Sequence, residues 1–191
     1  MTDAGETRRV VVGISGASGV IYGIRLLEAL RDCGIETHLV MSRSAEITLA
    51  HETDYKVAQV RALADRWYQQ ADIGAAIASG SFRTMGMVVA PCSVRSMSEI
   101  ATGVTSGLLT RAADVVLKER RRLVLMVRET PFHLGHLRTM AQLAEMGAII
   151  APPLPAFYPR PKELEDLIDH SIGRVLDLLG INNDLAHRWK E

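Results

Sequence analysis

The residues that most directly suggest chemistry form a glycine- and serine-rich stretch near the start of the chain, Gly13-Ile14-Ser15-Gly16-Ala17-Ser18-Gly19. Glycines let a backbone turn sharply and approach a ligand, and free N–H groups at the start of a following helix attract an anion such as phosphate. The spacing matches neither the G-x-G-x-x-G pattern of dinucleotide sites nor a P-loop, which argues against NAD and ATP. A tight turn with hydroxyl helix caps is the alternative interpretation.

Hydroxyl groups also follow two other expected strands. Ser42 ends the run that begins at Thr37, and Pro91-Cys92-Ser93-Val94-Arg95-Ser96 follows the run from Met85 to Ala90. Ligands of open α/β sheets bind outside the carboxyl ends of the strands, so the three strand ends indicate one crevice. Taken singly, each serine is more often a helix N-cap than a ligand contact.

Charged residues flank the apolar run from Leu123 to Val127. The cluster from Lys118 to Arg122 precedes it and is typical of a solvated helix end, where cations complement the helix dipole. Arg128 and Glu129 follow it, at the expected carboxyl end of a buried strand. There an arginine can hold a phosphate and a carboxylate can act as acid or base, with a structural ion pair as the competing explanation.

The pair His133 and His136 has a spacing that could suggest a metal ion, but no further Cys or carboxylate stands at a convincing ligand spacing. We therefore expect surface or capping histidines and no metal. Trp189, near the C-terminus, is by itself an ordinary packing anchor.

These residues need a scaffold, and short apolar runs alternate with helix-period segments along the chain. This alternation predicts one doubly wound α/β domain with a parallel sheet of about five strands. The segment from His51 to Arg83 is the least regular, and we interpret it as a mobile flap over a site. The predicted strands are Val10–Ile14, Thr37–Ser42, Met85–Ala90, Leu123–Val127 and Ala148–Ala151, and the predicted helices are Val20–Cys33, Ser96–Val104, Leu108–Arg121, Leu134–Met146 and Lys162–Leu179.

Composition excludes several classes of partner. The chain has 191 residues, 48% of them hydrophobic, and its 22 basic and 22 acidic residues cancel, so we expect neither nucleic-acid binding nor attraction to an anionic membrane. Cys33 and Cys92 fit reduced thiols. No leader-like segment or apolar run of membrane-spanning length is present, and we expect a cytoplasmic protein.

Together these residues resemble the UbiX family of flavin prenyltransferases, which implies a Rossmann-like or flavodoxin-like fold and binding of FMN. The resemblance runs from Val10 to about Trp189. Its stretches are Gly13–Gly19 with Tyr22-Gly23, Glu52-Thr53-Asp54, Ala90-Pro91-Cys92-Ser93, Leu109–Val115, Lys118–Arg121, Val127–Pro131 and Pro155-Ala156-Phe157-Tyr158.

The reaction implied by this resemblance joins a dimethylallyl group from dimethylallyl phosphate to N5 and then C6 of reduced FMN, without a metal. The product, prenylated FMN, serves a UbiD-type decarboxylase. The resemblance also implies that neighbouring subunits of a homo-oligomer, a dodecamer in this family, share each site. On this expectation residues 1–191 form one FMN-binding domain, and residues from about 162 to 191 complete the site of a neighbouring subunit.

Site roles follow from the same resemblance, residue by residue. Ser18 is expected near flavin N5, Glu129 handles protons, and Glu52 and Trp189 line the site. The chain departs from the family pattern at Val94 and Arg95, where some members carry Thr and Gly. The expected FMN contacts are Gly16, Ala17, Ser18, Ser42, Ser93, Val94, Arg95, Ser96 and Arg128, and the expected contacts to the prenyl phosphate are Lys118, Tyr158 and Arg174.

Three alternatives remain open at this point. A flavin-dependent cysteine decarboxylase would carry a Pro-Ala-Met-Asn-type segment and a catalytic His after the early strands, and neither occurs here. An FMN-dependent aromatic-acid decarboxylase fits the same resemblance but has only plain FMN as cofactor. A flavin carrier would have no use for a second phosphate clamp, so Lys118, Tyr158 and Arg174 discriminate against it.

Overall fold

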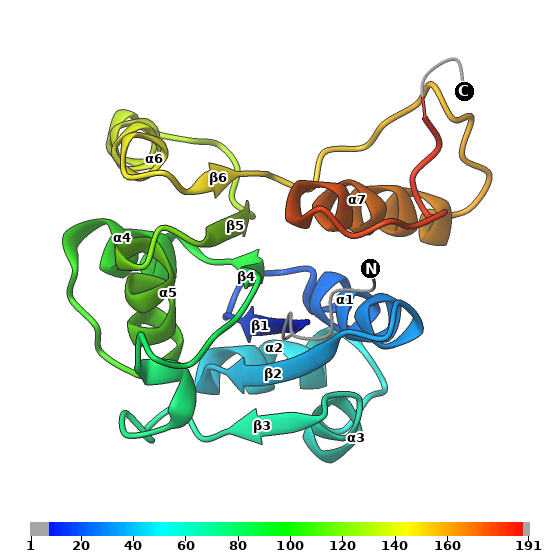
Figure 1. Ribbon diagram of the computed structural model, residues 1–191. Helices are drawn as coiled ribbons and strands as arrows, with labels where there is room; N and C mark the ends of the chain where they lie inside the picture. Colours follow the sequence, from blue (N-terminus) through cyan, green and yellow to red (C-terminus); the bar gives the residue numbers. More distant parts are fainter. Residues whose placement is uncertain (1–7, 189–191) are drawn as a thin grey trace, which may run out of the picture.

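A six-stranded parallel sheet forms the centre of the protein, with strand order β3-β2-β1-β4-β5-β6 (Figure 1). Figure 1 presents the computed structural model, which describes residues 8–188. The strands are β1 (Arg9–Ile14), β2 (Glu36–Met41), β3 (Arg66–Tyr68), β4 (Gly86–Cys92), β5 (Arg122–Val127) and β6 (Ile149–Ile150). The helices are α1 (Val20–Asp32), α2 (Arg43–Glu52), α3 (Val57–Ala62), α4 (Val94–Thr102), α5 (Leu108–Lys118), α6 (Leu134–Glu145) and α7 (Leu164–Leu179), with a 3-10 turn η1 (Ala76–Ala78).

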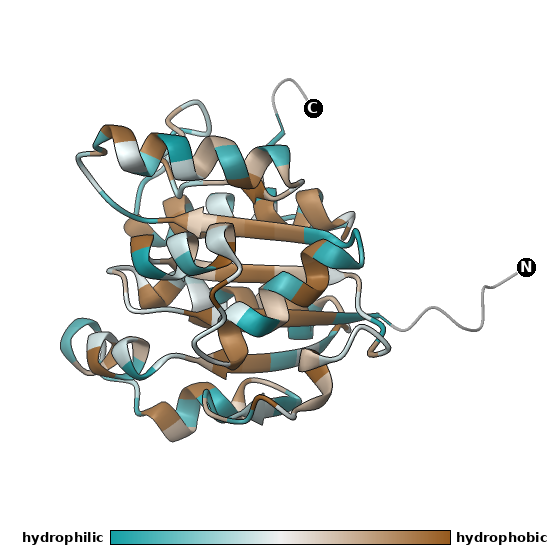
Figure 2. Cartoon of the chain, turned by 90° about the vertical axis from the view of Figure 1, so that its left-hand side faces the viewer, coloured by the Kyte–Doolittle hydropathy of each residue, from teal (hydrophilic) through white to brown (hydrophobic). Residues whose placement is uncertain are grey.

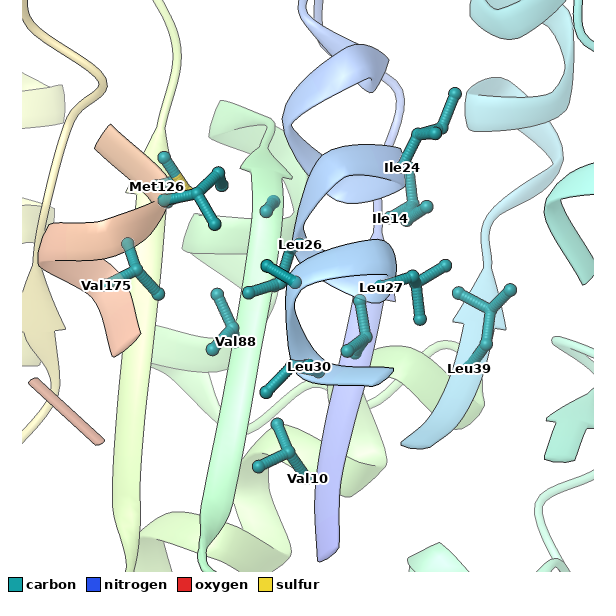
Figure 3. Packing of buried hydrophobic residues seen from close by; sticks show 14 of the residues in the cluster. Val10, Ile14, Ile24, Leu26, Leu27, Leu30, Leu39, Val88, Met126 and Val175 are labelled. Atoms are coloured by element: carbon teal, nitrogen blue, oxygen red, sulfur yellow. The ribbon is translucent and has the colours of Figure 1, made fainter. Parts of the chain in front are cut away.

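Helices cover both faces of the sheet, and this explains why the central strands are continuous apolar runs. Successive side chains of a strand point to opposite faces. Val10 and Val12 of β1 therefore pack in the cluster that includes α1 and α7, whereas Val11 packs with α4 and α5. Figure 3 shows α1 with Leu27 and Leu30 in front of the strands, and Figure 2 shows the hydrophobic strands lying between the helices.

The predicted single α/β domain with a parallel sheet is confirmed. Every predicted strand is present, but the sheet has one strand more than expected. The extra strand, β3, pairs only with β2 at the sheet edge and exposes Arg66 and Trp67, so it has no apolar alternation to reveal it.

The segment from His51 to Arg83, interpreted from its sequence as a flap, contains α3, β3 and η1. It is anchored to the domain by the buried side chains of Val60, Ala75 and Ile77. No helix within residues 8–188 is both long and apolar enough to span a bilayer.

Candidate functional site

The carboxyl ends of β1, β2 and β4 meet at one cleft, as the three hydroxyl-rich strand ends predicted. Helices α1, α2 and α4 start there, each directly after its strand. The cleft has a volume of about 250 Å³. It is lined by Gly16, Ser42, Arg43, Ser44, Gln70, Ser93, Arg95, Ser96, Glu99, Ser106 and Thr110.

Gly16 allows the turn after β1 to lie against the start of α2. A Cβ atom at position 16 would stand only 2.2 Å from the Cβ of Ser44, a separation that packed carbon atoms do not reach. The glycine therefore brings the backbone of the turn to the wall of the cleft. This is the close approach that the glycine-rich stretch predicted.

Ser15 joins the turn after β1 to the turn after β4. Its buried hydroxyl donates to the carbonyl of Pro91 (2.9 Å) and accepts from the N–H of Ser93 (2.7 Å). Sequence reasoning gave this residue no role of its own, because its partners lie more than 70 positions away. Ser15 holds two walls of the cleft in register.

Ser42 and Ser93 are helix N-caps as well as cleft residues. The Ser42 hydroxyl accepts from the N–H of Ala45 (3.1 Å), and the Ser93 hydroxyl accepts from the N–H of Ser96 (3.2 Å). Within residues 8–188, the N–H groups of the first two residues of α2 and of α4 have no acceptor. Both helix starts therefore present free donors to an anion.

The start of α1, in contrast, is occupied by the protein's own carboxylate. Glu52, the last residue of α2, accepts from the N–H groups of Gly19 (2.8 Å) and Val20 (3.2 Å). The start of α5 is filled in a similar way, because the Gln70 side chain accepts from the N–H of Leu109 (3.2 Å). Of these four helix starts, only those of α2 and α4 remain open to a bound anion.

Glu52 and Ser18 meet beside Arg128. Partial burial raises the pKa of the Glu52 carboxyl, but hydrogen bonds from Ser18, Gly19 and Val20 and the charge of Arg128 outweigh it and leave that pKa below its ordinary value. Arg128 also acts on Tyr22, where burial raises the pKa of the phenol and the Arg128 charge opposes the rise. The structure thus brings Ser18, Glu52 and Arg128 together at the start of α1.

Arg128 and Glu129 follow β5, as expected for site residues. The N–H of Arg128 donates to the carbonyl of Cys92 (3.0 Å), which connects this segment to β4. The Glu129 carboxylate accepts from the N–H of Thr130 (2.9 Å), and it forms no ion pair with Arg128. The competing explanation of a structural ion pair between these two residues is therefore wrong.

Lys118 lies away from this cleft within one subunit. It ends α5 just before β5 and pairs with the neighbouring Glu119. Glu129 comes after β5, and the six residues of that strand separate the two positions by about 20 Å at the usual rise of a strand. One subunit alone does not bring Lys118 to Glu129.

Tyr158 and Arg174 lie together beside α7, at a third place. The Tyr158 hydroxyl donates to the carbonyl of His187 (2.8 Å), and its ring packs edge-on against His170, one turn before Arg174. Arg174 pairs with Asp177 (2.7 Å). Trp189, which was expected to line the site, lies outside the described residues.

Two further expected FMN contacts, Ala17 and Val94, lie in the turn before α1 and at the start of α4. Ala17 donates its N–H to the carbonyl of Ser15 (2.9 Å), and Val94 is the first residue of α4. Sequence reasoning missed six residues that line the cleft: Arg43, Ser44, Gln70, Glu99, Ser106 and Thr110. The position of Arg43 and Ser44 directly after a predicted N-cap was the signal that could have revealed those two.

The two histidines considered as metal ligands form a helix cap, as predicted. His133 accepts through Nδ1 from the N–H of His136 (3.3 Å) at the start of α6, and the two rings stack. Among residues 8–188, no group of three or more His, Cys, Asp or Glu side chains is arranged to hold a metal ion.

Comparison with known proteins identifies close relatives. The flavoprotein family model matches residues 2–176. The flavin prenyltransferase UbiX of Escherichia coli K12 is 60% identical over 186 residues, covering 96% of this chain and 98% of the relative. The flavin prenyltransferase UbiX of Thauera aromatica is 58% identical over 181 residues, covering 95% and 93% of the two chains.

Solved structures give the same result. The crystal structure of AnUbiX (PadA1) in complex with FMN and dimethylallyl pyrophosphate matches with a TM-score of 0.95 and 49% identity, covering 97% of this chain and 99% of that one. A dodecameric FMN-dependent Ubix-like decarboxylase from Escherichia coli O157:H7 matches with a TM-score of 0.93 and 47% identity, covering 96% and 100%. The cysteine decarboxylase TvaF, at 16% identity and a TM-score of 0.64, shares the fold alone.

Proposed function

Since this chain belongs to the flavoprotein family and, within it, to the UbiX flavin prenyltransferases, we propose how its residues divide the work of prenylating FMN. The protein is an enzyme, a transferase that moves a dimethylallyl group from dimethylallyl phosphate to FMN. Reduced FMN supplies N5 and C6, the two atoms that the prenyl group joins. The residues of the chain bind, orient and exchange protons around that reaction.

The phosphate of FMN fits the cleft between the starts of α2 and α4. Those helices present free N–H groups and the positive ends of their dipoles, together with the hydroxyls of Ser42 and Ser96 and the cation of Arg95. The start of α1 cannot take the phosphate, because Glu52 already accepts its N–H groups. This contrast between open and filled helix starts is the observation that supports FMN binding in this orientation.

With its phosphate there, the flavin ring extends along the turn after β1. Gly16 and Ala17 provide backbone contacts, and Ser18 lies beside the ring at the end marked by Glu52 and Arg128. We assign Ser18 and Glu52 to holding and relaying a proton near N5. Arg128, close to both, adds to the hydrogen bonds that lower the pKa of Glu52, and it would balance negative charge on the flavin.

Glu129 is our candidate for the proton transfers of prenyl addition and ring closure. It stands at the carboxyl end of β5, next to Arg128, where a carboxylate can reach a ligand in the cleft. Within residues 8–188 this carboxylate accepts a hydrogen bond from the N–H of Thr130, which leaves oxygen lone pairs for a ligand proton.

The leaving phosphate of the prenyl donor requires cations and hydroxyl donors as its C–O bond breaks. Lys118, Tyr158 and Arg174 are the candidates for these contacts. Lys118 lies at one place in the subunit, and Tyr158 and Arg174 lie at another, where Arg174 lines a cavity with Met126 of β5. Lys118 would reach the flavin from a neighbouring subunit. A homododecamer, like that of the Escherichia coli O157:H7 relative, is the assembly we propose, with residues from about 162 to 191, including Trp189, completing a neighbour's site.

The partner that consumes the product is, in this proposal, a UbiD-type decarboxylase, and the compartment is the cytoplasm, where a reduced flavin is maintained. The direct test is anaerobic incubation of the purified protein with reduced FMN and dimethylallyl phosphate. The extracted flavin should be heavier by one C5 prenyl unit. FMN of unchanged mass, recovered from folded and FMN-loaded protein, would favour an FMN-dependent decarboxylase instead.

A further inference from the structure

One carboxylate inside the proposed phosphate cleft calls for an explanation. Glu99 of α4 is only 16% exposed and lines the cleft, where a negative charge would repel the phosphate of FMN. Both of its carboxylate oxygens accept hydrogen bonds. One accepts from Arg95 Nε (2.9 Å), and the other accepts from the hydroxyls of Ser106 (2.6 Å) and Thr110 (3.3 Å).

The contact to Arg95 engages Nε and leaves both terminal nitrogens of the guanidinium for a phosphate. Nε is bound by Glu99, and within residues 8–188 the two terminal nitrogens of Arg95 have no protein acceptor. Those nitrogens form the fork that binds two phosphate oxygens at once. The Arg95 side chain is 77% exposed, so without Glu99 nothing in the described chain would hold its position.

Glu99 is in turn fixed by donors on another element. Ser106 and Thr110 lie at the start of α5, so the carboxylate is held from α5 while it holds a side chain of α4. A partly buried carboxylate that accepts from three donors is held in one orientation, and it orients the guanidinium in turn. The entropy cost of ordering the Arg95 side chain is then incurred when the protein folds, so FMN binding does not incur it again.

We propose that Glu99 is a positioning residue that aims Arg95 at the phosphate of FMN, and that this pair makes the enzyme select FMN over riboflavin. The inference rests on the proposed function for the identity of the ligand. It gives a role to position 95, where the sequence departs from the family pattern. It also explains why a carboxylate is tolerated in an anion site, since its charge is neutralised by the arginine that it holds.

The test is binding of oxidised FMN and of riboflavin, measured by quenching of flavin fluorescence, so that no prenyl transfer is needed. Arg95→Ala should weaken FMN binding by about tenfold to a hundredfold, the usual worth of charge-assisted hydrogen bonds, and leave riboflavin binding unchanged. Glu99→Ala should weaken FMN binding in the same direction by a smaller factor. Glu99→Gln should recover part of the loss, because its amide oxygen can still accept from Arg95 Nε.

A double-mutant comparison separates positioning from simple support of the fold. In the Arg95→Ala background, Glu99→Ala should have no further effect on FMN binding, whereas in an Arg43→Ala background its effect should persist. Glu145→Gln, which removes an exposed carboxylate on α6, is the matched control and should change nothing. Equal losses for FMN and riboflavin, or a Glu99 effect that survives removal of Arg95, would overturn the proposal.

These outcomes are independent of the proposed reaction. A wild-type protein that shows the predicted FMN selectivity but returns FMN of unchanged mass would refute prenyl transfer and leave the proposed role of Glu99 and Arg95 intact. A protein that prenylates FMN, and whose FMN affinity is unchanged by substitution of Arg95 or Glu99, would refute the proposed role of this pair and leave the reaction intact.

Discussion

Glu52 illustrates how one side chain can decide where a ligand binds. In many nucleotide-binding α/β proteins the helix after the first strand receives a phosphate. Here the carboxylate of Glu52 takes those N–H groups itself. In the proposed orientation of FMN, the phosphate therefore lies at the starts of α2 and α4, and the start of α1 faces the reactive part of the flavin.

Glu52 should make folding stability depend on pH. Its pKa in the folded protein is lowered below the ordinary 4.5, so the ionised form favours the folded state. This stabilisation is complete above the unfolded pKa and is lost as the pH falls through the folded pKa. At neutral pH, Glu52→Gln should therefore cost about 1 kcal/mol of unfolding free energy, the worth of a helix cap.

Urea unfolding of the wild type and of Glu52→Gln at a series of pH values measures this difference. The gap between the two proteins should close as the pH drops below the folded pKa. Glu145→Gln, on the exposed side of α6, is the control and should follow the wild type throughout. A gap that stays constant down to low pH would show that the Glu52 charge is not what stabilises the start of α1.

Glu129 should affect chemistry and not FMN binding, if it transfers protons as proposed. Glu129→Gln keeps the shape of the side chain and its acceptor for the N–H of Thr130 but cannot take up a proton at neutral pH. We expect the rate of prenylation in a single turnover to fall by about a hundredfold or more, the usual contribution of a general acid or base. FMN affinity should remain that of the wild type, and a parallel loss of affinity would instead indicate a binding role.

At the scale of elements, the cleft depends on how closely the turn after β1 approaches α2. Gly16→Ala would place a methyl group 2.2 Å from the Cβ of Ser44, so the turn or the helix start must move. Overpacking of this kind costs about 1–3 kcal/mol, and the movement should weaken FMN binding as well. Thermal unfolding and flavin fluorescence measure the two effects. Gly74→Ala, whose nearest neighbour would lie at 3.7 Å, is the matched control and should be close to neutral; equal behaviour of both variants would contradict the argument.

The sequence revealed elements where burial on both sheet faces left an apolar run, as in β1, β4 and β5. It concealed β3, whose residues Arg66, Trp67 and Tyr68 are largely exposed at an edge and have no period of their own. Ser42 and Ser93 of the cleft could be identified because each directly follows a strand. The contact of Glu52 with Gly19 could not, since 33 positions separate the two residues and only the folded chain brings α2 back to the start of α1.

In the whole molecule, the parallel sheet places the proposed site residues at opposite ends of its strands. Arg128 and Glu129 follow β5 at its carboxyl end, whereas Lys118 precedes β5 at its amino end. The separation of about 20 Å given by the strand rise is too large for one ligand of the size of dimethylallyl phosphate to bridge. A complete site must therefore combine Lys118 of one subunit with Glu129 of another, if both residues act in the reaction.

Mixed oligomers test this sharing directly. Lys118→Ala and Glu129→Gln should each be nearly inactive alone, yet co-expressed as differently tagged chains they should regain about a quarter of wild-type activity, since in a random equal mixture each required residue is intact with a chance of one half. Arg128→Ala mixed with Glu129→Gln is the control. Both of these residues follow the same β5, so every contributing subunit carries a defect and no activity should return. A Lys118 and Glu129 mixture as inactive as its parents would mean that a single subunit supplies both residues, and that the sharing of sites between subunits is wrong.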